Sequence, residues 1–362
     1  MISSNADLDK LVSKLMKYEI IALDTEFMWR NTYYPKLCLI QIATPDQVYL
    51  IDPLADIDLK KLKPILEDLN ILKVFHAAQH DISILDIEAD ANTQMTADTQ
   101  TAAEFLGLIH QGSLQWLLLH YNLADLPKKQ KLSNWAKRPL TEGQISYAKD
   151  DVLYLIDAYL CLKKELENMG RLSWFQEESQ VEKLPLLNTT PQNAYKKISG
   201  QFKFPYPVRQ RIKKLTAWRE TQAIQKNTLV RYILENESLI KLCFTPPTTS
   251  LEIKQPDYQL SSRQVERYSE TILKILFECD LPDDTSRPPR KPKINVDKTE
   301  LNALQAQLQD LCEQANIIPP LVASKTDLKL YIQRDPKQVK RLTQGWRKHI
   351  THSILPCHTD EN

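Results

Sequence analysis

The chain has 362 residues, of which 42% are hydrophobic, and a formal net charge of +1, so it is long enough for two or three domains with real cores. Its first residues lack the basic and apolar regions of a signal peptide, and no run of about 18 apolar residues occurs, which argues against secretion and membrane insertion. The six cysteines are scattered without a Cys-x-x-Cys pair, which favours free thiols and predicts a cytoplasmic protein.

The two parts of the chain differ in charge. Residues 1–172 hold 18 Lys and Arg against 24 Asp and Glu, whereas the remainder holds 29 against 22. An acidic part joined to a basic part suits a metal site beside a polyanion-binding arm, although solvated surfaces also produce differences of this size.

A buried strand that ends in two carboxylates is the first informative feature. A helix with Asn5 as its cap is expected over residues 5–18, and residues 20–27 follow as a nearly continuous apolar run, typical of a strand buried on both faces. Asp24 and Glu26 interrupt this run and point to the same face, about 7 Å apart along the chain. No Lys or Arg lies within the stretch, so a divalent metal is the expected partner of these anions. Taken alone, the pair also fits a strand that ends in a polar turn.

The next elements alternate strands with helices, which predicts an α/β domain. Strands over residues 37–43 and 48–51 are expected to complete a meander, and a helix over 57–69 precedes a fourth strand at 73–76. That strand passes directly into a helical segment, and Asp81 lies at the junction, where active-site groups are common. The structural alternative for Asp81 is a helix N-cap.

A basic run in the following region contains further candidate residues. After helices expected over 99–106 and 114–121, a basic run contains Lys128, Trp135 and Arg138, which suits contact with phosphates and bases. Solvated lysines around a core tryptophan would give the same pattern.

A late helix begins after Thr141. Tyr147 and Asp151 are four residues apart in it, so both project from one face. The alternative for Tyr147 is a tyrosine packed on the core.

Together these residues resemble the signature of the DEDD exonucleases, in the subgroup whose third motif has a tyrosine. Asp24-x-Glu26 lies on a first strand, Asp81 follows a later strand, and Tyr147-x-x-x-Asp151 lies on a late helix. The pattern is most similar to the ribonuclease D family, which it also matches at residues 30, 32–35, 76–77, 98–100, 135, 138–141 and 152. The resemblance covers residues 1–175 and implies an RNase H-like α/β catalytic domain with a mixed sheet flanked by helices.

Two all-α domains are expected beyond the catalytic domain. Residues 208–282 are similar to the HRDC domain, although many HRDC domains have a proline near Asn227 or Thr228. Residues 297–356 resemble a second, more divergent HRDC-like domain. The segments 176–207 and 283–296, the latter basic and proline-rich, are interpreted as linkers.

The resemblance implies a two-metal nuclease site. Asp24, Glu26, Asp81 and Asp151 would bind two divalent cations, Mg²⁺ or Mn²⁺, and Glu26 would also touch the terminal ribose. Tyr147 would orient the attacking water rather than act as the base, because a free tyrosine has a pKa of about 10.

Five residues are candidates for binding substrate. Phe27 lies beside the carboxylates and is a candidate for stacking on the terminal base, with a core position as the alternative. His76 is a candidate for contact near the scissile bond, with a backbone-satisfied core histidine as the alternative. The others are Lys128, Trp135 and Arg138.

The implied function is a metal-dependent 3′-to-5′ exoribonuclease that trims structured RNA, by family analogy tRNA precursors, and releases nucleoside 5′-monophosphates. One alternative is a DNA exonuclease of the same superfamily, since contact with the 2′-hydroxyl cannot be read from sequence. Another alternative is an RNA-binding scaffold with an inactive nuclease fold. The presence of all five motif residues argues against this alternative. We expect the protein to bind RNA, to have no membrane partner and to be a monomer.

Overall fold

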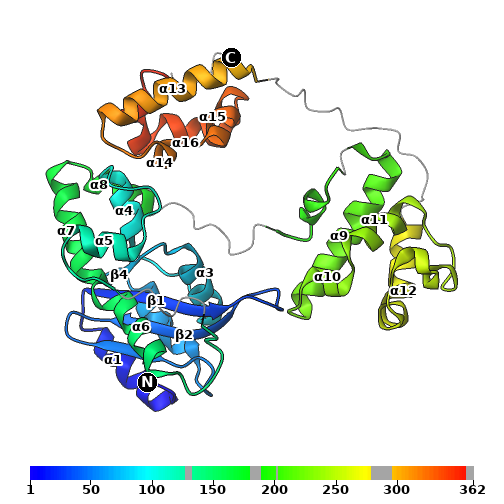
Figure 1. The fold of residues 1–362 in the computed structure, drawn as a ribbon, viewed down its shortest axis with the longest axis horizontal. Helices are drawn as coiled ribbons and strands as arrows, with labels where there is room; N and C mark the ends of the chain where they lie inside the picture. Colours follow the sequence, from blue (N-terminus) through cyan, green and yellow to red (C-terminus); the bar gives the residue numbers. More distant parts are fainter. Residues whose placement is uncertain (127–132, 180–188, 201–202, 279–295, 356–362) are drawn as a thin grey trace. The chain divides into compact units, whose positions relative to one another are not determined.

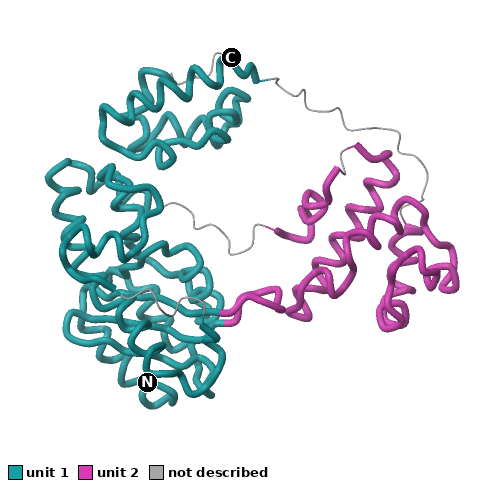
Figure 2. The backbone as a smooth tube through the Cα atoms, viewed as in Figure 1, with its two compact units in different colours: residues 1–27, 37–186, 292–362 teal, residues 28–36, 187–291 magenta. Residues whose placement is uncertain are grey.

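The computed structural model describes residues 1–126, 133–179, 189–200, 203–278 and 296–355. Two compact units make up the chain: a first unit of residues 1–27, 37–186 and 292–362, and a second unit of residues 28–36 and 187–291 (Figure 2). Lys128 and all but the last residue of the expected linker 283–296 lie outside the described residues. No described helix is both long and apolar enough to cross a membrane.

The first unit is built on a five-stranded mixed sheet in the order β3-β2-β1-β4-β5 (Figure 1). Its strands are β1 (Ile20–Met28), β2 (Lys36–Ala43), β3 (Val48–Ile51), β4 (Leu72–Phe75) and β5 (Thr96–Asp98). β4 pairs in parallel with β1 and β5, whereas β2 and β3 are antiparallel. The expected α/β fold with a mixed sheet is confirmed, although β5 has only three residues and the sequence pattern does not predict it.

Helices cover both faces of this sheet. They are α1 (Asn5–Leu15), α2 (Lys63–Glu67), α3 (Gln79–Glu88), α4 (Thr99–Phe105), α5 (Leu114–His120), α6 (Glu142–Leu153), α7 (Leu155–Asn168) and α8 (Leu172–Ser179). Alternate residues of β1 enter two different cores: Ile21 and Leu23 pack with α1 and α3, whereas Ala22 packs with α4 and α7. β1 is therefore buried on both faces, as its apolar run predicts.

Two details of the expected helices differ in the structure. Ser4, not Asn5, caps α1, because the Ser4 hydroxyl accepts the backbone N–H of Asp7. The Asn5 side chain instead accepts the backbone N–H of Asp58 at 2.8 Å. The helix expected over residues 57–69 is a 3₁₀ turn, Leu59–Leu62, followed by the short α2.

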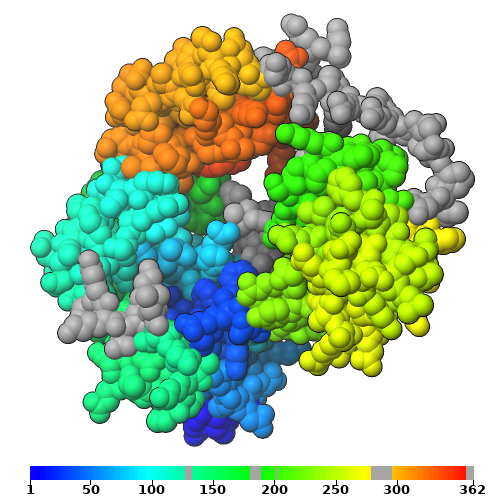
Figure 3. Space-filling view, turned by 45° about the vertical axis from the view of Figure 1, so that its right-hand side comes forward, coloured from blue at the N-terminus to red at the C-terminus, as the bar shows by residue number. Residues whose placement is uncertain are grey.

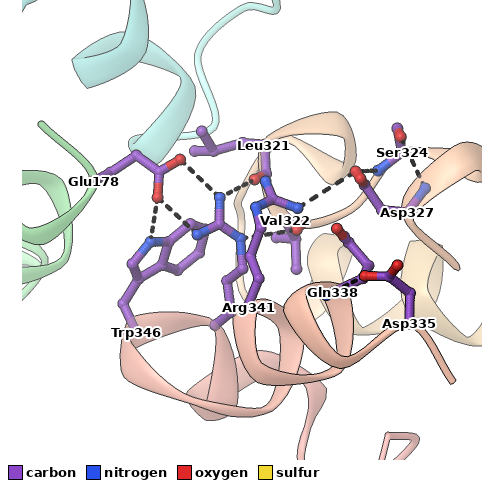
Figure 4. A network of polar contacts seen from close by, with 10 residues as sticks. Glu178, Leu321, Val322, Ser324, Asp327, Asp335, Gln338, Arg341 and Trp346 are labelled. Atoms are coloured by element: carbon purple, nitrogen blue, oxygen red, sulfur yellow. Dashed lines mark hydrogen bonds and ion pairs between the residues drawn. The ribbon is translucent and has the colours of Figure 1, made fainter. Parts of the chain in front are cut away.

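A C-terminal bundle packs on the helices of the α/β domain within the first unit. It consists of α13 (Lys298–Gln314), α14 (Pro319–Val322), α15 (Lys325–Ile332), α16 (Pro336–Thr343) and α17 (Lys348–Thr351). In Figure 4, Glu178 of α8 accepts the indole N–H of Trp346 at 2.8 Å. The same carboxylate pairs with the buried Arg347 guanidinium through two 2.7 Å contacts. The Arg171 guanidinium also donates to the carbonyls of Phe105 and Asn316, which ties α4 to the end of α13.

The second unit is a helical domain that also contains the connection between β1 and β2. Its helices are α9 (Tyr206–Gln225), α10 (Val230–Ile233), α11 (Asn236–Phe244) and α12 (Ser262–Phe277). Residues 28–36, called here the β1–β2 tip, contribute the buried Tyr33 to its core. Asn227 has a φ of 43°, which proline cannot adopt, and its side chain accepts the backbone N–H of Tyr34 at 2.9 Å. A proline in place of Asn227 would be incompatible with this backbone conformation and would lose the contact with Tyr34.

Candidate active site

Three of the four expected carboxylates meet at the end of β1. Oxygen atoms of Asp24, Glu26 and Asp151 all lie within 4.8 Å of one another. Asp24 and Glu26 share one face of the strand, as the two-residue alternation requires, and α6 brings Asp151 to them. All three side chains are partly buried, so the cluster lies at the boundary of the core.

Asp81 lies close to this cluster but outside it. It is 8% exposed and lies in the first turn of α3, where Ala78 holds the N-cap position, so Asp81 is not a helix cap. Its carboxylate accepts a 2.5 Å hydrogen bond from the Thr25 hydroxyl. Burial raises the pKa of Asp81 to about 6.

The crowding of carboxylates has an electrostatic consequence at Asp24. Burial raises the pKa of Asp24 well above its ordinary value, and the charges of Asp81, Asp151 and Glu26 raise it further. Ionised carboxylates at this density are costly unless a cation compensates them. Oxygen-only ligands favour hard divalent cations, so the donor set fits a Mg²⁺ or Mn²⁺ site.

Asp98, which belongs to the family pattern at residues 98–100, holds the turn that leads into α3. Its two carboxylate oxygens accept the backbone N–H groups of Ala77 at 2.9 Å and Ala78 at 3.0 Å. Ala77 has a φ of 59°, a conformation that non-glycine residues adopt at a cost. Asp98 therefore positions the junction that carries Asp81, a role that the sequence pattern does not reveal because the contact spans about 20 residues.

Tyr147 lies one turn before Asp151 on α6. A capping box of Thr141 and Gln144 begins this helix, which fixes the start expected from the sequence. Burial, the charges of Asp151 and Glu26, and a hydrogen bond to Asp151 raise the pKa of Tyr147 above its ordinary value. The phenol is therefore protonated at neutral pH, and its O–H is directed at the Asp151 carboxylate.

The candidate substrate-binding residues have internal partners. His76 lies between Thr99 Oγ1, at 2.8 Å from Nδ1, and the carbonyl of Gly112, at 2.9 Å from Nε2, and burial lowers its pKa. This geometry matches the alternative of a satisfied core histidine. Phe27 is half-buried, packs against the core and lies 6.2 Å from the His80 ring, measured between centroids. Substrate contact by His76 and Phe27 stays a prediction.

Arg138 and Trp135 are built into the fold of the same region. The Arg138 guanidinium makes two 2.6 Å contacts with the Asp52 carboxylate and one with the carbonyl of Cys38. The pKa of Asp52 is lowered by this pairing. Trp135 is 2% exposed, and its ring lies 6.1 Å from that of Tyr147. These contacts support structural roles, and substrate contact by either residue stays a prediction.

The chain is similar to known proteins over nearly its whole length. A 3′-5′ exonuclease family model matches residues 1–167, and an HRDC domain model matches residues 208–276. The chain is 32% identical to ribonuclease D of Desulfotalea psychrophila, over 99% of this chain and 98% of that protein. It is 31% identical to ribonuclease D of Bartonella henselae, over 97% of this chain and 87% of that protein.

Solved structures are similar over comparable lengths. Escherichia coli RNase D, described as an exoribonuclease involved in structured RNA processing, superposes with a TM-score of 0.85 at 26% identity. That match covers 98% of this chain and 96% of the other. The catalytic core of RRP6 from Trypanosoma brucei has a TM-score of 0.59 at 25% identity and covers 77% of this chain and 78% of its own.

Proposed function

Because the chain belongs to the ribonuclease D family and is a 3′-to-5′ exoribonuclease, we propose that it trims the 3′ ends of structured RNA, with tRNA precursors as substrates. The products are nucleoside 5′-monophosphates. The observation that carries this proposal is the cluster of Asp24, Glu26 and Asp151 at the end of β1. Structured RNA as the substrate class is supported by the description of the Escherichia coli relative.

The family depends on divalent metals, and the carboxylate cluster fits that requirement. Asp24, Glu26, Asp81 and Asp151 would hold two ions, Mg²⁺ or Mn²⁺. Divalent cations, when bound by such carboxylates, activate water for attack on phosphorus and stabilise charge on the leaving 3′ oxygen. Thr25 keeps the Asp81 carboxylate next to this site through the 2.5 Å hydrogen bond.

Tyr147 orients the attacking water in this proposal. Its phenol is protonated at neutral pH, because its pKa lies above the ordinary value. A protonated phenol cannot accept the proton of that water, so Tyr147 acts by holding the water in line. Its position on the same helix as Asp151, one turn away, fixes the distance between the two groups.

The state of the cysteines bears on where the protein is located. Among the described residues, Cys161 and Cys312 are free thiols, in agreement with a reducing compartment. We therefore place the protein in the cytoplasm, and we propose that it acts as a monomer.

The substrate proposal is tested with a matched panel of nucleic acids. The purified protein is incubated with Mg²⁺ and a 5′-labelled tRNA precursor that carries a 3′ trailer, and separately with single-stranded DNA of the trailer sequence. We expect stepwise shortening of the precursor and release of nucleoside 5′-monophosphates, with much slower shortening of DNA. Equal rates on DNA and RNA would contradict the assignment to RNA.

A further inference from the structure

The Arg138 guanidinium is fully used by contacts within the protein. An arginine side chain has five N–H groups, and Arg138 makes five hydrogen bonds through its three nitrogens. Two of them reach the two carboxylate oxygens of Asp52, both at 2.6 Å. The other three reach backbone carbonyls, those of Cys38 at 2.6 Å, Trp135 at 2.7 Å and Lys137 at 3.0 Å. The number of bonds equals the number of donors, so this side chain is saturated without a phosphate.

These five hydrogen bonds, called here the Arg138 clamp, join residues 135–138 to the sheet. Cys38 lies on β2 and Asp52 directly follows β3, so the clamp reaches two strands. The Asp52 carboxylate is itself fixed, because Oδ1 also accepts the backbone N–H of Leu54 at 3.0 Å. The side chains of Arg138 and Asp52 are 26% and 13% exposed. A bidentate pair of this kind, shielded from water, defines one geometry for the segment that it holds.

The clamp acts on the surroundings of Tyr147 in two ways. Trp135 is 2% exposed, and its ring centroid lies 6.1 Å from that of Tyr147, within the range of packed aromatic pairs. The indole N–H has no hydrogen-bond partner among the described residues, so packing and the bond from Arg138 to the Trp135 carbonyl hold this ring. In addition, Thr141, the cap of α6, follows Arg138 by three residues, so the clamp limits where that helix begins.

The helix that carries Tyr147 is buried along one stripe. Over its twelve residues, α6 buries Gln144, Ala148 and Val152, which recur at every fourth position. Its other residues are partly or fully exposed, and the helix lies at the molecular surface, in the green part of Figure 3. A displacement of a reacting group by about 1 Å can slow a reaction about 100-fold. The contacts that fix the start of this helix therefore matter for catalysis.

We propose that Arg138 is a positioning residue: its clamp holds Trp135 and the start of α6 so that the Tyr147 hydroxyl stays in place for the reaction. The proposal rests on the exoribonuclease function and on the role of Tyr147 proposed above. Contact of Arg138 with a substrate phosphate is the competing role. The two roles differ at Asp52, because an anion does not bind phosphate, whereas both partners of a clamp are needed to hold it.

The test uses conservative variants of the full-length protein. Arg138→Lys keeps the charge but cannot reproduce five directed bonds, and Asp52→Asn removes the charge but keeps an oxygen for the N–H of Leu54. Arg347→Lys is the matched control, because Arg347 is also a buried arginine paired with a carboxylate, but its contacts lie in α8 and the C-terminal bundle. Under conditions in which circular dichroism shows each variant to be folded, kcat and KM are measured on a tRNA precursor in Mg²⁺, and affinity is measured in EDTA.

We expect Arg138→Lys and Asp52→Asn each to lower kcat by about fivefold or more, with RNA affinity within about twofold of the wild type. Combined with Tyr147→Phe, Arg138→Lys should lower kcat by less than about twofold further, because the clamp acts through the hydroxyl that this variant already lacks. Arg347→Lys should keep the wild-type kcat.

Three outcomes of these measurements would overturn the proposal. Weaker RNA binding by Arg138→Lys, with wild-type behaviour of Asp52→Asn, would assign Arg138 to phosphate contact. Additive losses in the double variant with Tyr147→Phe would show a general role in the fold. A wild-type kcat in both clamp variants would show that the clamp has no part in the reaction.

A second readout does not depend on activity. In protein labelled with 3-fluorotyrosine, the fluorine NMR resonance of Tyr147 is identified by its loss in Tyr147→Phe. We expect this resonance to shift in Arg138→Lys and in Asp52→Asn and to stay in place in Arg347→Lys. An unshifted resonance in the clamp variants would overturn the proposal. Shifted resonances in a protein whose wild type cleaves no RNA would count against the proposed function alone.

Discussion

The Tyr33 hydroxyl donates a 2.6 Å hydrogen bond to the Glu220 carboxylate, although 187 residues separate them in sequence. Both side chains are buried, at 8% and 4% exposure. Tyr33 belongs to the β1–β2 tip and Glu220 to α9. The bond therefore joins this tip to the helical domain within the second unit. The fold of the second unit therefore includes a piece of the catalytic sheet's connection.

Tyr33→Phe tests the strength of this connection. It leaves a buried carboxylate without its phenol donor, so we expect the free energy of unfolding of the second unit to fall by about 1–3 kcal/mol. Urea denaturation followed by intrinsic fluorescence measures this loss. Tyr34→Phe is the control, because the Tyr34 hydroxyl forms no hydrogen bond with a described residue, and it should change stability by less than about 0.5 kcal/mol. Equal stability of the two variants would contradict the importance of the bond.

Arg347→Met tests the attachment of the C-terminal bundle to α8. The Arg347 side chain is 4% exposed, and its removal leaves the partly buried Glu178 without its ion-pair partner. We expect the free energy of unfolding to fall by about 3–5 kcal/mol, measured by chemical denaturation. Lys163→Met is the matched control, because it breaks an ion pair with Glu167 whose side chains are 42% and 50% exposed. The control should cost less than about 1 kcal/mol, and a similar loss in both variants would count against the interpretation.

The Tyr147→Phe variant distinguishes a role of Tyr147 in orienting water from a role in binding RNA. Loss of the phenol hydroxyl should lower kcat by about tenfold or more, because small misplacements of a reacting group are costly. Affinity for the precursor should stay within about twofold, since no contact of Tyr147 with the RNA body is proposed. Single-turnover cleavage and binding in EDTA measure the two quantities. The control is Tyr154→Phe, a tyrosine at the end of the same helix, and a wild-type kcat in Tyr147→Phe would remove the proposed role.

The carboxylate site should make the metal-free protein less stable as pH rises. The pKa of Asp81 is raised from 3.8 to about 6 in the folded state, so between these values the folded chain holds more protons than the unfolded chain. Stability contributed by the protonated Asp81 is present below pH 4 and is lost as pH rises through 6, with a total of about 2–3 kcal/mol. Asp24 acts in the same direction, because its pKa is also raised.

Thermal melts in EDTA between pH 4 and 7.5 check this prediction. Asp81→Asn should show a smaller decline over that range than the wild type. Addition of Mg²⁺ or Mn²⁺ should raise Tm more at pH 7.5 than at pH 4.5, because the ions bind ionised carboxylates. An unchanged decline in Asp81→Asn would show that another group is responsible.

Sequence alone identifies the local features of this fold well. The apolar run before Asp24 predicts a strand buried on both faces, and the spacing of Tyr147 and Asp151 predicts one helix face; both are found in the structure. These features follow from side-chain periodicity, which needs only a few neighbouring residues. The α/β character of the first domain follows from the same kind of pattern, whereas the mixed sheet and the two helical domains are implied by the family resemblance.

The remaining features depend on contacts between residues far apart in sequence, which no local pattern encodes. Arg138 looks like a phosphate-binding residue because its run is basic, yet its guanidinium is paired with Asp52, 86 residues earlier. Asp98 is named from the sequence only as part of the family pattern, yet it caps α4 and also holds the turn before Asp81 through Ala77 and Ala78. The strand β5 is too short to show a period of two residues.

A comparison of RNA cleavage by Asp24→Asn and by the wild type tests whether the carboxylate cluster at the end of β1 is the catalytic site. A 5′-labelled tRNA precursor with a 3′ trailer is incubated with each protein in Mg²⁺, in Mn²⁺ and in EDTA, and binding is measured in parallel. We expect a metal-dependent ladder that shortens from the 3′ end with the wild type, and no ladder with Asp24→Asn although it still binds the precursor. A near-normal ladder with Asp24→Asn, or a wild-type ladder that persists in EDTA, would contradict catalysis by this carboxylate site.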